Sequence, residues 1–203
     1  MTNRKKVGGL LLILAAPLLI LLFLENFGRQ HYAIPTNPAE AEGLSAEVPV
    51  GALGQTFRLP EPLADASAKS VSEGDFAGKI LIVYYLPMAQ SDTAEFVLEK
   101  LTRVQNVFEQ DSSVRLLTIV PTPQLDSLSI LARRYRGQPE AWSFLANTTQ
   151  ADISTQLLPK GTNAATLLLV DQGRQVKGYY DGMQEKEIDR LVAEARILLY
   201  DLK

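Results

Sequence analysis

The chain has 203 residues, 46% of them hydrophobic, with a formal net charge of -3. This allows one domain with a sizeable core plus one further segment. It holds no cysteine and a single histidine, which excludes disulfides, thiolate nucleophiles, thiolate metal ligands and zinc sites built from several imidazoles. Without a basic excess, nucleic acid is not an expected partner.

Residues 7–24 are all apolar, glycine or proline. At 1.5 Å per residue this run of about 18 residues reaches roughly 27 Å, close to the thickness of a bilayer core. The pattern predicts a transmembrane helix over residues 7–27. The alternative is a cleaved signal peptide, but Glu25, Asn26 and Phe27 follow the run in place of a small-residue cleavage site, which favours an uncleaved anchor.

The charges around this segment predict its orientation. Residues 4–6 are all basic, whereas Glu25 and Arg29 cancel on the other side. Basic residues remain in the cytoplasm. We therefore expect a cytoplasmic N-terminus over residues 1–6 and a single-pass protein of the cytoplasmic (inner) membrane.

Residues 28–50 contain three prolines and no sustained hydrophobic period, which is typical of a tether. The only histidine, His31, lies in this tether, where a surface role is the simplest interpretation. The remaining residues, 51–203, are expected to form one exported domain on the periplasmic side of the membrane.

The first strong element of the domain is a continuous apolar run at residues 79–86, which predicts a strand buried on both faces. A helix is expected next, because apolar residues follow with helical spacing from Val97 to Phe108. Asp92 and Glu95 resemble a capping box at its start. Residues 114–120 predict a second buried strand.

Thr122 and Pro123 then predict the start of a second helix, with Leu128, Leu131, Ala132 and Tyr135 as its apolar stripe. Residues 142–145 follow without a clear type, and a short helix is expected near residues 153–158.

Residues 166–171 predict a third buried strand, and residues 175–180 its antiparallel partner after a Gln172-Gly173-Arg174 turn. The chain ends in a helix whose predicted inward side chains are Ile188, Leu191, Val192, Ala195 and Leu199. This order predicts an α/β fold, a mixed sheet with helices on both faces. It is the thioredoxin-like arrangement, although the pattern alone also allows other α/β sandwiches.

Four sequence segments resemble the Sco/SenC family. They are residues 78–85, 119–135, 142–145 and 169–173. In the second segment Pro123, Asp126 and Leu131 match the family, whereas Thr122 stands where the family has aspartate. The resemblance implies a membrane-anchored, thioredoxin-like factor that delivers copper to, or reduces thiols of, cytochrome c oxidase.

The chain departs from the family at the copper ligands. The family's two cysteines and histidine align with Met88, Asp92 and Asn163. Thiolates select copper because they are soft anionic ligands, whereas carboxylates and amides suit harder ions. We therefore expect a degenerate copper site, with no metal, no cofactor and no catalytic residue.

Structural roles are available for all three substitutes. Asp92 lies where a helix begins and can interact with free backbone N–H groups. Met88 is a flexible apolar side chain beside Pro87. Asn163 follows Gly161 in a segment that suits a turn with a left-handed residue.

Two functions remain open. The favoured hypothesis is a non-enzymatic assembly factor or accessory subunit of a respiratory, cytochrome oxidase-type membrane complex. The alternative is a copper carrier or thioredoxin-like enzyme that uses Met88, Asp92 and Asn163 as replacement ligands.

Overall fold

The computed structural model describes residues 53–86, 92–135, 140–147, 158 and 162–200. The predicted N-terminus, anchor and tether lie outside these ranges, as does Met88. Within the described ranges no helix combines the length and the apolar character needed to cross a membrane.

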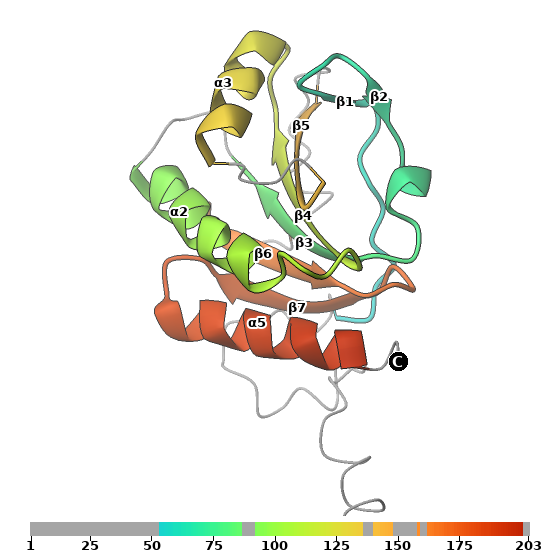
Figure 1. Ribbon diagram of the computed structural model, residues 1–203, viewed down its shortest axis with the longest axis vertical. Coiled ribbons are helices and arrows are strands. Elements are labelled where there is room, and N and C mark those ends of the chain that lie inside the picture. The colour runs from blue at the N-terminus through green and yellow to red at the C-terminus, as the bar shows by residue number, and fades with distance from the viewer. Residues whose placement is uncertain (1–52, 87–91, 136–139, 148–157, 159–161, 201–203) are drawn as a thin grey trace, which may run out of the picture. The chain divides into compact units, whose positions relative to one another are not determined.

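The described residues form one mixed sheet with the strand order β2-β1-β5-β4-β3-β6-β7 (Figure 1). Strand β4 lies between β3 and β5 and is parallel to both, whereas β6 is antiparallel to β3 and β7 to β6. The strands are β1 (Leu63–Asp65), β2 (Ser70–Val71), β3 (Ile80–Tyr85), β4 (Val114–Val120), β5 (Trp142–Asn147), β6 (Thr166–Val170) and β7 (Val176–Asp181).

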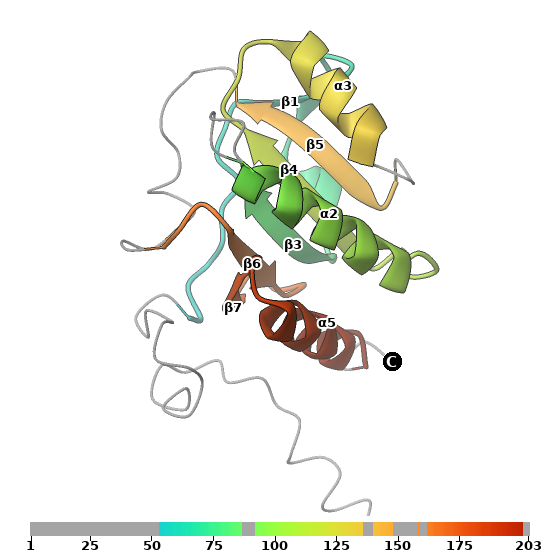
Figure 2. The same ribbon diagram turned by 90° about the vertical axis from the view of Figure 1, so that its left-hand side faces the viewer.

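Three helices pack on one face of this sheet (Figures 1 and 2). They are α2 (Asp92–Val107), α3 (Leu125–Tyr135) and α5 (Glu185–Tyr200). The connections from β3 to β4 and from β4 to β5 step across the sheet in the same direction. Because such crossovers are right-handed, α2 and α3 fall on the same face.

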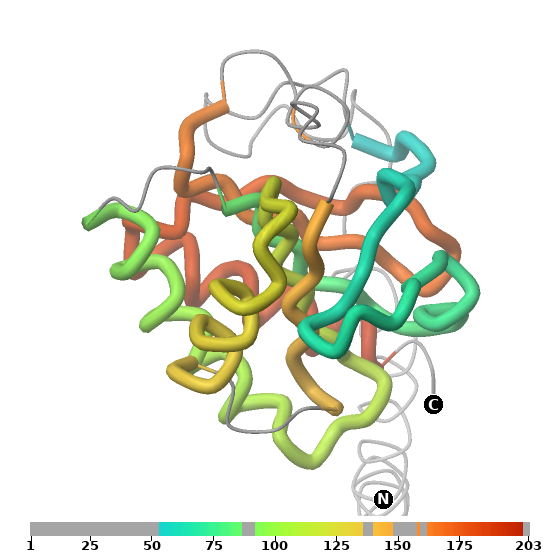
Figure 3. Tube along the Cα trace, turned by 90° about the horizontal axis from the view of Figure 1, so that it is seen from above, coloured from blue at the N-terminus to red at the C-terminus, as the bar shows by residue number. Residues whose placement is uncertain are grey.

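The opposite face is covered differently. The residues before and after the β1–β2 hairpin, including a short 3-10 helix η3 (Glu73–Phe76), pack there against β3, β4 and β6 through Leu53, Phe57, Leu59 and Phe76. This part of the chain lies on the side away from α2 and α3 in Figure 3. Of the helical stretch predicted near residues 153–158 only Leu158 is described, and it packs against this second cluster. The three long helices of the described residues therefore lie on one face of the sheet. The predicted arrangement, with helices on both faces, is not found for these three.

The central strands confirm the sequence interpretation. All residues of β3 and β6 are buried, because both faces of these strands are covered. The predicted stripe of α2 is also buried. In α5 the buried residue of the last turn is Leu198, at 6% exposure. The predicted Val192 and Leu199 are only half-buried, which corrects two residues of the predicted stripe.

Two parts of the sheet had no clear sequence signal. Residues 142–147 form β5, whose Trp142 and Phe144 are buried on the helix face and whose Leu145 is buried on the other. The β1–β2 hairpin has only three and two residues in its strands, too few for a period. The second helix begins at Leu125, later than predicted; the Thr122 hydroxyl accepts a hydrogen bond from the Gln124 N–H (3.0 Å) in the turn before it.

Candidate functional site

The fold brings two of the three degenerate copper-ligand positions to the same end of the sheet. Asp92 is the first residue of α2, which follows the carboxyl end of β3. Asn163 precedes β6, and because Tyr84 of β3 pairs with Leu167 in antiparallel register, residues before 166 lie beyond that same end of β3. Met88, in the connection between β3 and α2, lies outside the described residues.

Asn163 builds a turn. Its side-chain Oδ1 accepts hydrogen bonds from the Ala165 N–H (2.9 Å) and from the Thr166 hydroxyl (3.2 Å), and its backbone carbonyl accepts from the Thr166 N–H (3.2 Å). The turn role predicted from the sequence is thus confirmed. It is achieved through the side chain, because the described non-glycine residues with positive φ are Ala68 and Arg174, not Asn163.

Two further contacts hold this turn against its neighbours. The buried Tyr84 hydroxyl on β3 donates to the Ala164 carbonyl (3.2 Å), and burial raises the pKa of this phenol. Gly182, after β7, donates its N–H to the Ala165 carbonyl (2.9 Å). A Cβ at Gly182 would lie 2.8 Å from that carbonyl oxygen and 3.0 Å from Val97 of α2, so only glycine allows this approach.

Asp92 is exposed in the first turn of α2. The expected capping-box partner, Glu95, interacts across the helix pair: its carboxylate forms an ion pair with Arg134 and accepts a hydrogen bond from the Tyr135 hydroxyl (3.4 Å), both on α3. Glu95 is therefore used in contacts with α3 and not in the predicted capping box. Asp92 faces solvent, where its carboxylate interacts favourably with the partial positive charge of the helix N-terminus.

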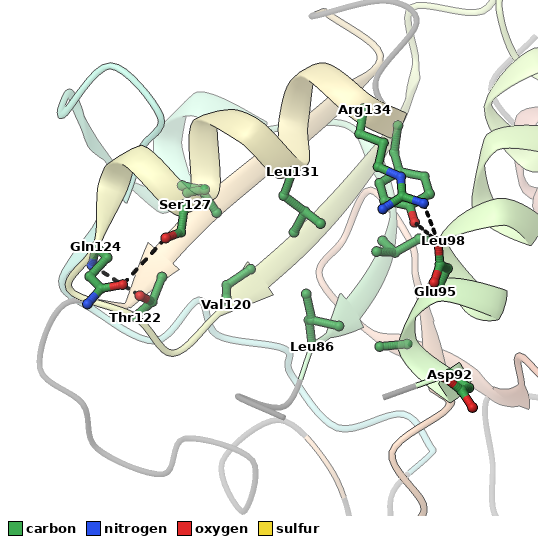
Figure 4. A pocket seen from close by; sticks show the side chains of 13 residues that line it. Leu86, Asp92, Glu95, Leu98, Val120, Thr122, Gln124, Ser127, Leu131 and Arg134 are labelled. Atoms are coloured by element: carbon green, nitrogen blue, oxygen red, sulfur yellow. Dashed lines mark hydrogen bonds and ion pairs between the residues drawn. The ribbon is translucent and has the colours of Figure 1, made fainter. Parts of the chain in front are cut away.

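A pocket of about 540 Å³ opens between α2 and α3 beside these residues (Figure 4). Its apolar floor comes from the carboxyl ends of β3 and β4, through Leu86 and Val120, and from both helices, through Leu98, Leu128 and Leu131. The position is the one where α/β sheets commonly bind ligands, outside the carboxyl ends of parallel strands.

The two ends of the pocket are polar and differ in charge. Thr122, Gln124 and Ser127 supply hydroxyl and amide groups at one end, where the Ser127 hydroxyl donates to Gln124 Oε1 (3.4 Å). Asp92, Glu95 and Arg134 lie at the other end (Figure 4), and Tyr135 joins them there through its hydrogen bond to Glu95. Burial raises the pKa of the Tyr135 phenol; Arg134 opposes the rise, and Glu95 and Glu99 add to it.

This arrangement does not fit copper. Asn163 Oδ1 is occupied by two hydrogen bonds from its own turn, Asp92 offers a hard oxygen ligand, and the chain has no cysteine. Among the described residues no group of three or more His, Cys, Asp or Glu side chains is placed to hold a metal ion.

Of the three candidate positions singled out from the sequence, Asp92 lines the pocket, whereas the pocket itself could not be predicted. Leu131 and Tyr135 were predicted as part of an inward stripe of α3, yet both are only half-buried and line the pocket. Arg134 was not singled out at all. Its only signal is the opposite charge of Glu95, 39 residues earlier, and sequence gives no reason to pair charges at that distance.

A second polar cluster lies between β7 and α5. The fully buried Tyr180 hydroxyl donates to Glu194 Oε2 (2.6 Å), and the Arg190 guanidinium lies over the Tyr180 ring at 4.5 Å. Arg190 also pairs with Glu187 (2.6 Å) and donates to the Tyr179 carbonyl (3.0 Å). Burial raises the pKa of Glu194, against the lowering effects of Tyr180 and Arg190. The cluster holds α5 on the sheet.

Comparison with known proteins supports the fold. No protein-family model matches the chain, and no curated protein sequence matches it. Many solved structures do match.

One is a SCO1/SenC family lipoprotein from Bacillus anthracis, at 17% identity and TM-score 0.58 over 71% of this chain and 94% of that one. Another is BsSco, described as a member of the Sco family of cytochrome c oxidase assembly proteins, at 15% identity and TM-score 0.57 over 70% and 93%. Copper-bound yeast Sco1 matches at 16% identity and TM-score 0.53 over 70% and 90%. The predicted resemblance is confirmed in three dimensions: the described domain has the thioredoxin-like fold of the Sco/SenC proteins.

Proposed function

We propose that this chain is a non-enzymatic, membrane-anchored, Sco/SenC-like protein that acts as an assembly factor or accessory subunit of a respiratory, cytochrome oxidase-type complex. The observation that carries the proposal is a Sco-like fold in a chain that has no cysteine. A fold can be retained while its chemistry is lost. What then remains for selection to act on is the surface of the domain and its attachment to the membrane.

The turn at Asn163 supports the loss of metal transfer. A copper carrier needs ligand atoms that are free to coordinate the metal. The Asn163 side-chain oxygen instead accepts two hydrogen bonds within its own turn. Replacing a ligand by a residue that stabilises the local backbone is the expected outcome when the metal no longer constrains the position. A role through protein contacts requires no such ligand.

The membrane topology is part of the proposal. Residues 7–27 anchor the chain, residues 1–6 stay in the cytoplasm, and the domain lies on the periplasmic side, as the charges around the segment predict. Protease added to intact spheroplasts should release the domain. Protection in spheroplasts, with digestion only after lysis, would reverse the topology and remove the route to a periplasmic partner.

Co-purification tests the partner. The tagged full chain, extracted from its native membrane in mild detergent, should elute with subunits of a respiratory complex. A matched chain that ends after residue 50 asks whether the anchor alone is sufficient; we expect the domain to be required. A full chain that elutes only as a free monomer contradicts the proposal.

The alternative is a copper carrier with replacement ligands, favoured only by the soft thioether of Met88 four positions before the Asp92 carboxylate. Metal analysis after dialysis separates the two functions. Stoichiometric copper in the purified chain, lost in Met88→Leu, would establish the carrier. We expect none, and no thiol–disulfide exchange either, because the chain has no sulfur nucleophile.

A further inference from the structure

The pocket between α2 and α3 has an apolar floor that the described residues leave partly open. Leu98 and Leu128 are buried at 2% and 1% exposure, but Val120 and Leu131 are only half-buried, and both face the cavity. Leu131 projects from α3 over Val120 and Leu86 in Figure 4. Because apolar surface gains free energy when it leaves water, this floor favours an apolar occupant.

The charges at one end of the pocket restrict the occupant further. Asp92, Glu95 and Glu99 are exposed acidic residues on one side of the first two turns of α2. Arg134 is the cation among the described lining residues, and it pairs with Glu95. The helix N-terminus of α2 adds about half a positive charge, and the C-terminus of α3 about half a negative charge. With the exposed Arg133 of the same last turn of α3 included, the balance over the described residues at this end is negative by roughly one charge.

A negative rim beside an apolar floor matches a ligand with the opposite pattern. We propose that this pocket docks a short, mainly apolar segment of a partner protein that carries a lysine or arginine side chain. Its apolar side chains lie on Val120 and Leu131, and its cation lies near Asp92 and Glu99. Thr122, Gln124 and Ser127 at the far end offer hydrogen bonds to the segment's backbone.

The inference rests on the proposed function in one respect, that the occupant is a protein. The respiratory complex is not required by it. Charge complementarity of this kind acts mainly on the association rate and on the choice of partner, whereas the apolar contact supplies most of the affinity. The two contributions can therefore be separated by changing Leu131 and the acidic residues independently.

Photo-crosslinking in native membranes tests the proposal. The full chain carries p-benzoylphenylalanine either at Leu131, inside the pocket, or at Ile130, the next residue of α3, which is 67% exposed and does not line the pocket. Crosslinked peptides are sequenced by mass spectrometry. We expect label 131 to capture one protein segment, apolar and with a lysine or arginine, at least tenfold more strongly than label 130.

A charge change provides the second arm. Asp92→Lys combined with Glu99→Lys leaves the Glu95–Arg134 pair intact and should reduce the crosslink from label 131 about tenfold. Glu109→Lys combined with Asp111→Lys makes the same charge change beyond the other end of α2 and should leave the crosslink unchanged. A label at the exposed Gln124 serves if the label at 131 prevents folding.

Several outcomes overturn the proposal. They are no crosslink from within the pocket, equal yields at 130 and 131, capture of lipid, of a small molecule or of this chain itself, an acidic or uncharged captured segment, or an unchanged yield after the Asp92 and Glu99 changes. A basic apolar segment from a protein outside any respiratory complex supports the pocket and contradicts the proposed function. Co-purification of a respiratory complex together with a captured segment that is acidic or uncharged supports the proposed function and contradicts the docking proposal.

Discussion

Helix α2 has a helix on each side, and the two contacts differ. Toward α5, Lys100 and Arg103 form ion pairs with Glu185 and Asp189, and the Gly182 backbone approaches α2 closely enough that a Cβ would meet Val97. Toward α3, one ion pair between Glu95 and Arg134 spans the gap, and a pocket of about 540 Å³ lies beside it. Among the described residues, the contact toward α5 is closed and the contact toward α3 leaves a pocket.

The lengths and sequences of the two partner helices explain the difference. Helix α5 has 16 residues and buries Ile188, Leu191, Ala195 and Leu198. Helix α3 has 11 residues and buries only Leu128 and Ala132. With fewer inward side chains, α3 covers β5 but does not fill the space toward α2. Substitutions on each side of α2 test whether the α3 side is the more loosely packed of the two.

The largest difference is expected in the packing. Leu191→Ala, at a residue with 0% exposure, should lower the free energy of unfolding by about 3 kcal/mol, because it leaves a cavity. Leu131→Ala, on the half-buried pocket wall, should cost about 1 kcal/mol or less. Urea unfolding followed by the fluorescence of Trp142, the only tryptophan, measures both. Equal losses would mean that the α3 side is as tightly packed as the α5 side.

Gly182→Ala tests the close approach on the α5 side. The new methyl group would lie 2.8 Å from a backbone oxygen, which cannot move without displacing the Asn163 turn. We expect a loss of about 2 kcal/mol in the same unfolding measurement. Gly74→Ala is the matched control, because its Cβ would meet only the Ser72 hydroxyl oxygen at 3.6 Å. An unaffected Gly182 variant would show that the turn adjusts freely.

The ion pairs should have smaller effects. Glu185→Gln removes a partner shared by Lys100 and Arg103 and should cost about 1 kcal/mol, although Arg103 keeps Asp189. Glu95→Gln removes one exposed pair and should cost about 0.5 kcal/mol or less. Both losses should shrink in high salt. If Glu95→Gln proved the more damaging of the two, the α3 contact would depend on its charges more than on its packing.

The pH dependence of the free energy of unfolding tests the role of Glu194 on the α5 side. Burial raises its pKa above the ordinary value of 4.5, so the folded state keeps this proton to higher pH than the unfolded chain does. The resulting stabilisation is complete below pH 4.5 and is lost as the pH rises through the folded pKa. Glu194→Gln should remove this part of the pH dependence. Urea titrations at a series of pH values measure it, and parallel curves for parent and variant would contradict the assignment.

The sequence was most informative where burial is uniform. Continuous apolar runs predicted β3, β4 and β6, because strands covered on both faces tolerate few polar residues. It was least informative for β5 and the β1–β2 hairpin. The serine at 143 interrupts the apolar run of β5, and the hairpin strands are too short to show alternation.

The candidate site divides in the same way. Asp92 and Asn163 were placed by their alignment with a resembling family, and the turn at Asn163 followed from its residue type. The contribution of Arg134 and of Leu131 could not be predicted. Both residues line a pocket formed by two helices and two strand ends. The spacing of residues along the chain does not predict that these elements come together.

The amino-acid sequence by itself determined what this protein lacks and which strands form its centre, since the absence of cysteine and long apolar runs are properties of composition and local order. The tertiary structure decided which face the helices share, which side of α2 is closed, and that Asn163 uses its side-chain oxygen within its own turn. These depend on crossover direction, helix length and close backbone approach. Such quantities arise only when segments distant in the chain pack together.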